Sequence, residues 1–201
     1  MTLTRELWVI LFLREVIPRT DLENSILVDG MNTQKCSVSN MLIKNLVDED
    51  FVNYRKVSMF IGCHSCTFKC DKMCGKQVCQ NSALATAPDI EVSIDRLVQR
   101  YLGNIYSQAV VFGGLEPFDD YDNLMAFIAE FRKHSSDDIV IYTGYTKDEI
   151  NSLFPSFIIK MKETENIVVK FGRFIPDQKP HYDEVLGVNL QSDNQYAERI
   201  S

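Results

Sequence analysis

The chain lacks any long apolar run, any block of like charges and any cluster of basic residues. Its apolar run from Leu7 to Leu13 is too short to span a bilayer, and no small-residue cleavage site follows it as in a signal peptide. The net charge of −7 argues against nucleic acid or an anionic membrane as the main partner, because both favour clustered Lys and Arg. We therefore expect a cytoplasmic protein that binds neither a membrane nor nucleic acid.

Familiar catalytic patterns are also missing. The three histidines, His64, His134 and His181, show no spacing typical of a catalytic set, and neither a Ser/His/Asp arrangement nor a phosphate-binding loop is visible. Internal repeats and low-complexity stretches do not stand out. The 201 residues, 45% of them apolar, suit one domain with a sizeable core. No side chain is assigned a catalytic role on these grounds.

Cysteine, in contrast, is concentrated in one place. Of the six cysteines, Cys36 stands alone and the other five fall within seventeen residues. Disulfide frameworks usually distribute their cysteines through small secreted domains, so this concentration favours a metal site in a reducing cytoplasm. The five clustered cysteines are Cys63, Cys66, Cys70, Cys74 and Cys79.

The first part of the chain differs from the rest. Residues 1–38 are irregular and show no turn-punctuated alternation of strands and helices, whereas a more coherent segment begins at Met41. Two interpretations stay open: an upstream extension, with translation starting at Met41, or an extra helix that packs on the domain. We assign residues 1–38 to an N-terminal extension of uncertain status and residues 39–201 to one domain.

From there, strand and helix patterns alternate. Short apolar runs predict strands, and apolar residues at helical spacing predict helices between them. Asp119 and Asp120 mark one helix entry, Thr146 with Glu149 fits a capping box at another, and Pro155 fits the end of that second helix. The predicted strands are 56–61, 109–112, 139–142 and 167–169; the predicted helices are 94–102, 124–131 and the one that opens at Thr146.

This alternation predicts an α/β fold with a parallel sheet. A complete eight-unit barrel needs about 250 residues, so we expect a partial, open barrel of about four to six βα units. Ligands of such folds bind at the carboxyl ends of the strands. The cysteine loop, Gly113–Gly114 and Thr143–Gly144 are all expected at that end.

The cysteines alone allow two kinds of metal site. Thiolates are soft ligands that suit both iron–sulfur clusters and zinc. A structural zinc needs four ligands, which Cys63, Cys66, Cys70 and Cys74 could supply. Three ligands, with the fourth iron left open, would instead indicate a 4Fe–4S cluster that binds a further molecule.

Several motifs resemble one family. Cys66-Thr67-Phe68-Lys69-Cys70 and Cys79-Gln80-Asn81-Ser82 resemble the start and end of the three-cysteine motif of the radical S-adenosylmethionine superfamily. Within it, the chain most resembles the proteins that activate glycyl radical enzymes, in particular anaerobic ribonucleoside-triphosphate reductases. Four further segments resemble motifs of that family and occur in the same order along the chain. They are Val111–Pro117, Tyr142–Tyr145, Lys170–Phe174 and Asn194–Gln195.

The spacing of the cysteines departs from the family's pattern. The family has two residues between its second and third cysteines, whereas eight residues separate Cys70 from Cys79. One assignment takes Cys66, Cys70 and Cys79 as cluster ligands, with Asp71–Lys76 as a local insertion. The other replaces Cys79 by Cys74. We favour the first, because Gln80 and Asn81 follow Cys79 as in the family motif.

The resemblance also implies where S-adenosyl-L-methionine binds. The family's Gly-Gly-Glu-Pro turn holds the amino group of the cofactor, and the corresponding residues here have Leu115 inserted. Thr143 at a strand end could donate a hydrogen bond, and Lys170 could pair with the cofactor's carboxylate. The cofactor-binding residues implied in this way are Gly113, Gly114, Glu116, Pro117, Thr143 and Lys170.

The resemblance implies a radical mechanism. A reduced 4Fe–4S cluster passes one electron to S-adenosylmethionine, which gives methionine and a 5′-deoxyadenosyl radical; this radical removes a hydrogen atom from a glycine of a partner enzyme. A flavodoxin or ferredoxin type of protein would supply the electron. The alternatives are a radical enzyme with another substrate, a zinc-stabilised binding protein without catalysis, and an iron–sulfur electron carrier with a fourth cysteine ligand.

Overall fold

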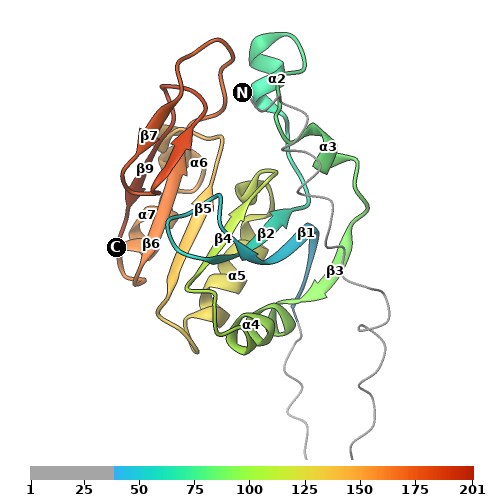
Figure 1. The fold of residues 1–201 in the computed structure, drawn as a ribbon, viewed down its shortest axis with the longest axis vertical. Helices are drawn as coiled ribbons and strands as arrows, with labels where there is room; N and C mark the ends of the chain where they lie inside the picture. Colours follow the sequence, from blue (N-terminus) through green and yellow to red (C-terminus); the bar gives the residue numbers. More distant parts are fainter. Residues whose placement is uncertain (1–38) are drawn as a thin grey trace, which may run out of the picture.

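Figure 1 shows a computed structural model of the chain, which describes residues 39–201. The expectations for residues 1–38, including the apolar run from Leu7 to Leu13 and the role of Cys36, lie outside the described residues. Among residues 39–201, no helix combines the length and the apolar character needed to cross a membrane.

Seven of the strands form one sheet, with the order β3-β1-β2-β4-β5-β6-β9. The four central strands are β2 (Ser58–Cys63), β4 (Ala109–Gly113), β5 (Asp138–Tyr142) and β6 (Ile167–Phe171), and they run parallel. The flanking strands are antiparallel to their neighbours: β1 (Asn40–Asp50), β3 (Ile90–Ser93) and β9 (Tyr196–Arg199). A separate hairpin consists of β7 (His181–Asp183) and β8 (Val188–Leu190).

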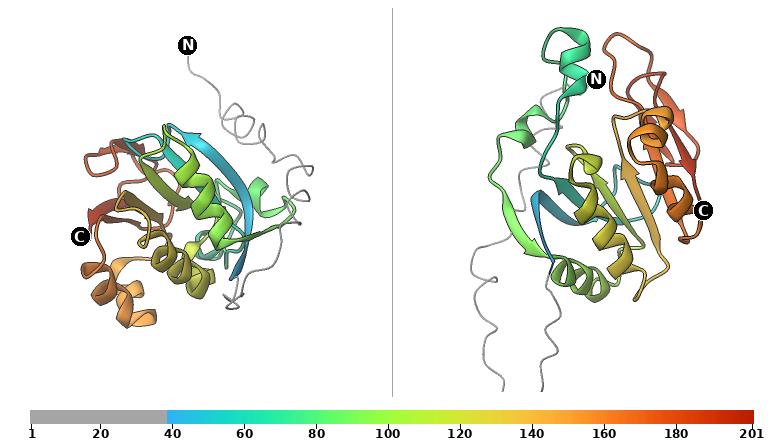
Figure 2. Two further views of the ribbon diagram at one scale, coloured as in Figure 1. Left: turned by 90° about the horizontal axis from the view of Figure 1, so that it is seen from below. Right: turned by 180° about the vertical axis from the view of Figure 1, so that it is seen from behind.

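The predicted strands are confirmed, and their burial explains why their sequences are continuous apolar runs. Every residue of β2, β4 and β6 is buried. Helices cover one face of the sheet, where Val110 contacts the main core, and Val111 faces a smaller apolar cluster on the other side. Figure 2 shows the helices together on one face. They are α4 (Ile94–Gly103), α5 (Tyr121–Phe131), α6 (Lys147–Leu153) and α7 (Pro155–Lys162).

The predicted helix signals are mostly confirmed. The Thr146 side chain accepts a hydrogen bond from the Glu149 backbone N–H, and the Glu149 carboxylate accepts from Thr146 N at 2.8 Å, which completes the capping box. Pro155 differs from the prediction. It does follow the end of α6, but it also begins α7, because proline is compatible with the first turn of a helix, where its missing N–H has no intrahelical acceptor.

The sheet itself requires two corrections. It is mixed rather than parallel throughout, since β1, β3 and β9 join it antiparallel. Within residues 39–201, three connections, from β2 to β4, β4 to β5 and β5 to β6, link parallel neighbours, which is fewer than the expected four to six βα units. The sheet is open, with β3 and β9 at its edges, and a barrel is not confirmed.

The parallel strands bring their carboxyl ends to one edge of the sheet. Gly62 of β2 pairs with Gly113 of β4, and Tyr142 of β5 pairs with Lys170 of β6. The segments that follow β2, β4, β5 and β6 therefore begin side by side. The cysteine loop, the Gly113–Gly114 turn and the Thr143–Gly144 turn are three of these segments, as expected.

Candidate functional site

The cysteine loop leaves the sheet after β2 and contains two short helices. These are α2 (Lys69–Cys74) and α3 (Ser82–Ala85), and neither contains a buried residue. In Figure 1, α2 lies beyond the carboxyl ends of the central strands. The loop is attached to the turn after β4 by two hydrogen bonds: Glu116 N donates to Ser65 O at 2.9 Å, and Thr67 N donates to the Asp119 carboxylate at 2.6 Å.

Three thiols of this loop influence one another. Burial raises the pKa of Cys66 to about 11 and that of Cys70 to about 12, and the charge of Cys79 contributes to both increases. Burial also raises the pKa of Cys79, and a hydrogen bond with the Cys70 side chain opposes that increase. A bound metal centre would lower the pKa of these thiols instead, because coordination favours the thiolate.

An aspartate that sequence reasoning missed connects two of these cysteines. The Asp71 carboxylate accepts hydrogen bonds from Val78 N at 2.7 Å and Cys79 N at 2.8 Å. The Cys70 thiol donates to the same oxygen at 3.7 Å. One oxygen atom therefore connects Cys70 to the backbone of Cys79, across the long gap between them.

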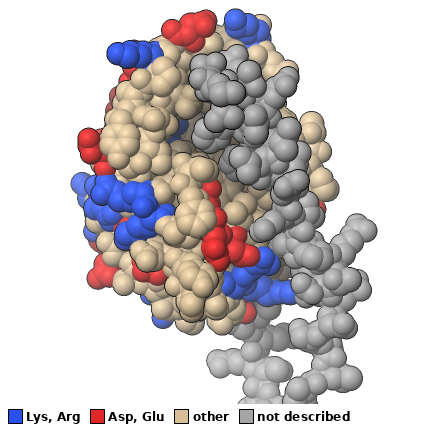
Figure 3. All heavy atoms as spheres, in the orientation of Figure 1, with Lys and Arg blue, Asp and Glu red and all other residues tan. Residues whose placement is uncertain are grey.

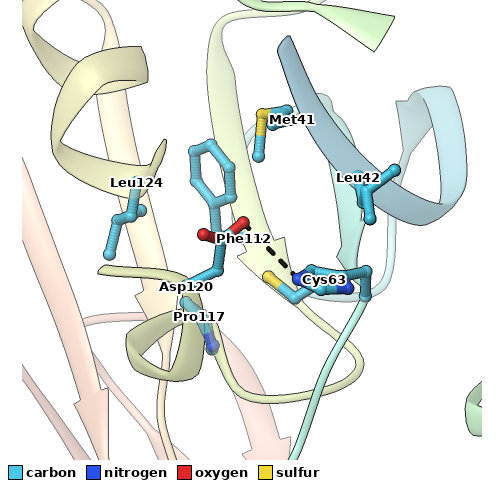
Figure 4. A pocket seen from close by; sticks show the side chains of 8 residues that line it. Met41, Leu42, Cys63, Phe112, Pro117, Asp120 and Leu124 are labelled. Carbon is cyan, nitrogen blue, oxygen red and sulfur yellow. Dashed lines mark ion pairs between the residues drawn. The ribbon is translucent and has the colours of Figure 1, made fainter. Parts of the chain in front are cut away.

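The remaining cysteines of the loop occupy different surroundings. Cys63 is buried at the end of β2 and lines a small pocket with Met41, Phe112 and Leu124 (Figure 4). Cys74 is the last residue of α2. Within residues 39–201, no three or more His, Cys, Asp or Glu side chains converge to hold a single metal ion; this holds for the four thiols of the zinc alternative and equally for Cys66, Cys70 and Cys79.

The predicted glycine turn packs tightly against the cysteine loop. Gly114 has a φ of +78°, and a Cβ added there would lie 2.5 Å from Leu84 Cδ2 of α3. A Cβ at Gly113 would lie 3.2 Å from the Phe60 ring. The positive φ at Gly114 and the close packing at both positions explain why glycine occupies them. The turn and the segment after Cys79 are thus direct neighbours.

Glu116 links the turn after β4 to the turn after β5. Its carboxylate is buried and accepts hydrogen bonds from Thr143 Oγ1 and Gly144 N, both at 2.8 Å, and from Phe118 N at 3.2 Å. Burial raises the pKa of Glu116 to about 7. Two predicted cofactor-binding residues, Glu116 and Thr143, are therefore hydrogen-bonded to each other. Pro117 follows Glu116 in the chain and is the buried first residue of the 3-10 helix η2 (Pro117–Asp120).

Lys170 is a buried cation at the same edge. It lies in β6 with 6% of its surface exposed, and its Nζ donates to Gly172 O at 2.5 Å. Burial lowers the pKa of Lys170 to about 7, and the charge of Glu116 opposes that decrease. A buried ammonium without an ionic partner in hydrogen-bond contact is expensive, so an incoming carboxylate would stabilise its charged form.

The two C-terminal motifs contact each other directly. Gly172 has a φ of +90°, and a Cβ there would lie 2.8 Å from Asn194 O. Gln195 Nε2 donates to Gly172 O at 3.3 Å, and Asn194 Nδ2 donates to Arg173 O at 2.9 Å. The Asn194–Gln195 segment therefore fixes the turn that follows Lys170.

Tyr145 connects the turn after β5 to the cysteine loop, and the sequence reading gave it no such role. Its hydroxyl donates to the Asp119 carboxylate at 2.9 Å, and Lys69 Nζ lies 4.0 Å from its ring centroid. Apart from the place of Tyr145 in the Tyr-Thr-Gly-Tyr motif, no sequence pattern predicts this contact. Around the site, positive and negative side chains are interspersed on the face shown in Figure 3, and neither sign covers it continuously.

Comparison with known proteins identifies a family to which the chain belongs. The model of a family described as "4Fe-4S single cluster domain" matches residues 54–192, which is more than half of the chain and includes all three candidate ligands and both turns. No curated protein and no solved structure matches the chain.

Proposed function

Because the chain belongs to the family of 4Fe–4S single cluster domains, we propose that it is a radical S-adenosylmethionine enzyme that installs a glycyl radical on a partner enzyme. The observation that carries this proposal is that the loop with Cys66, Cys70 and Cys79, the tightly packed glycine turn and the buried Lys170 all lie at one edge of the sheet. These are the components that such chemistry needs at one site, and they come from separate segments of the chain.

Cys66, Cys70 and Cys79 are the proposed cluster ligands. The donor set fits a cluster, because three soft sulfur atoms come from one loop and affect each other's protonation. A four-iron cluster is wider than a single ion, so its thiolates stand farther apart than those around zinc. When bound and reduced, the cluster supplies the electron that cleaves S-adenosylmethionine into methionine and a 5′-deoxyadenosyl radical.

The strand ends bind the amino-acid part of S-adenosylmethionine in this proposal. Lys170 offers a buried positive charge for the carboxylate, and the Gly113–Gly114 backbone borders the same edge of the sheet. Glu116 and Thr143 also brace the two turns through their mutual hydrogen bond, which holds the glycine turn against β5. Their role is therefore to position the binding surface.

The proposed substrate is a glycine of a partner protein, most simply an anaerobic ribonucleotide reductase. The 5′-deoxyadenosyl radical takes a hydrogen atom from the glycine Cα, which gives 5′-deoxyadenosine and a glycyl radical. The electron comes from a flavodoxin or ferredoxin type of donor. The support for a protein substrate is the family resemblance of Tyr142–Tyr145 and of Asn194–Gln195 at this site.

The first test uses anaerobically reconstituted protein with dithionite and S-adenosylmethionine. We expect release of 5′-deoxyadenosine, which chromatography would detect. Cys79→Ala should lose both cluster and product, whereas Cys74→Ala should keep both. The reverse result for these two variants would make Cys74 the third ligand. A wild-type protein that carries a cluster but never releases 5′-deoxyadenosine would contradict the proposed chemistry.

The second test addresses the substrate. The reduced protein is mixed with S-adenosylmethionine and an anaerobic ribonucleotide reductase, and electron paramagnetic resonance is recorded. We expect a glycyl radical signal that is lost when the reductase's radical glycine is replaced by alanine. Release of 5′-deoxyadenosine without any radical on the reductase would instead favour a radical enzyme that acts on another substrate.

A further inference from the structure

The segment between Cys70 and Cys79 has almost no apolar packing to fix its shape. The residues from Lys72 to Gln77 are mostly exposed, and Met73 has 51% of its surface in solvent. Helix α2 ends at Cys74, and Gly75 reverses the chain with a φ of 64°. Closing a loop of this length costs conformational entropy, which few buried contacts offset here.

Polar contacts therefore have to hold the two ends of this segment together. Asp71 provides two of them through one carboxylate oxygen, which accepts from the backbone N–H groups of Val78 and Cys79 at 2.7 and 2.8 Å. The Cys70 thiol also donates to this oxygen at 3.7 Å, but a thiolate that ligates iron has no proton to donate. Both N–H bonds are short and charge-assisted, which makes them stronger than neutral ones. They connect the first turn of α2 directly to Cys79.

We propose that Asp71 is a positioning residue that closes the segment between Cys70 and Cys79, so that two cysteines with eight residues between them bind the same cluster. The inference rests on the proposed ligand set of Cys66, Cys70 and Cys79. Asp71 does not itself ligate iron: its carboxylate directs the Cys79 backbone, and through it the Cys79 thiol, towards Cys70. It thereby compensates for a spacing longer than the family's.

The same carboxylate has an electronic consequence. It places a negative charge beside two proposed cluster ligands, Cys70 and Cys79. This charge disfavours the extra electron of the reduced cluster, because charge is one of the factors that set its potential. Asp71 is therefore expected to keep the cluster strongly reducing.

The test compares Asp71→Ala, Asp71→Asn and Cys74→Ala with the wild type, all as full-length, anaerobically reconstituted proteins. Iron and sulfide content, the rate of iron loss to a chelator and the cluster's reduction potential are measured. Asn keeps an oxygen acceptor but loses the charge. We expect Asp71→Ala to lose iron at least tenfold faster, Asp71→Asn to lose it within about threefold of the wild-type rate, and Cys74→Ala to match the wild type.

The potentials separate positioning from general stability. Asp71→Asn should show a potential shifted to a more positive value, with the thermal unfolding of its cluster-free form unchanged. Wild-type retention and potential in both Asp71 variants would overturn the inference while leaving the proposed function intact. Failure of the wild type to take up any cluster would refute the proposed function and this inference with it.

Discussion

The two halves of the candidate site are built in opposite ways. The strand-end half, with Glu116, Thr143 and Lys170, lies within the core: all three are buried and none exceeds 6% exposure. The cysteine loop has two short helices without a buried residue. Its backbone N–H groups donate to the carboxylates of Asp71 and Asp119, and these bonds help to hold it in place. The strand-end half is thus preformed by folding, whereas the loop depends on few contacts and would gain most from a bound cluster.

The largest expected contrast comes from removing one thiol. Cys66→Ala should abolish cluster binding and all release of 5′-deoxyadenosine, because two protein ligands cannot hold the cluster. The free energy of unfolding of the cluster-free protein should change by only about 1 kcal/mol, because the thiol is half-buried outside the main sheet. Iron content and urea unfolding measure the two effects. A variant that keeps its full iron content would show that Cys66 is not a ligand.

Glu116→Ala should show the opposite pattern, with a large loss of stability. The substitution removes the buried acceptor of three hydrogen-bond donors, which are the Thr143 hydroxyl and the backbone N–H groups of Gly144 and Phe118. We expect about 3 kcal/mol less free energy of unfolding, since each unsatisfied buried group costs about 1 kcal/mol or more. The matched control is Glu163→Ala, on an exposed residue, with an expected change within about 0.5 kcal/mol. Equal losses of free energy of unfolding in both variants would show that Glu116 does not stabilise the strand-end half.

Lys170→Met tests the strand-end half through pH. Burial lowers the pKa of Lys170 to about 7 from its ordinary 10.5, so between these values the unfolded chain binds a proton that the folded protein lacks. The wild type should therefore gain stability as the pH rises from 7 to 8.5, and the methionine variant should lack that gain. Urea unfolding at both pH values gives the difference. Parallel pH profiles for the two proteins would contradict the lowered pKa of Lys170.

Tyr145→Phe should have the smallest effect, because the substitution takes away only one hydroxyl group. It removes the hydroxyl donor to Asp119 but keeps the ring beside Lys69, and Asp119 still accepts from Thr67 N. A loss of about 1 kcal/mol in the free energy of unfolding is expected. Differential scanning calorimetry measures it. A loss as large as that of Glu116→Ala would mean that the loop is anchored more firmly than its contacts indicate.

The central strands and their helices were predictable because each carries its own signal. β4 is a continuous apolar run, β6 begins with one at Ile167–Val169, and α6 has both partners of its capping box within four residues. The antiparallel strands carry weaker signals. β1 includes Lys44, Asn45 and Asp48 among its apolar residues, and β9 has only Ala197 buried. These strands form because backbone groups pair with the edges of an existing sheet, which a local pattern does not reveal.

The site was predictable in its parts and not in its contacts. The glycines and cysteines were found through residue type and order along the chain. The bond between Glu116 and Thr143 spans 27 positions, and the bond between Tyr145 and Asp119 spans 26, so neither has a local signature. Asp71 is only eight positions from Cys79, but its direction depends on the turn after α2. Such contacts follow from the fold rather than from spacing.

The central claim is a cluster held by three cysteines, with one iron left open for S-adenosylmethionine. Mössbauer spectroscopy tests it most directly, on protein reconstituted with the Mössbauer-active iron isotope and recorded with and without S-adenosylmethionine. The account predicts that one iron of the four changes its spectrum when S-adenosylmethionine is added, while the other three do not. A four-iron spectrum that is unaffected by S-adenosylmethionine would contradict it and indicate a cluster closed by a fourth protein ligand.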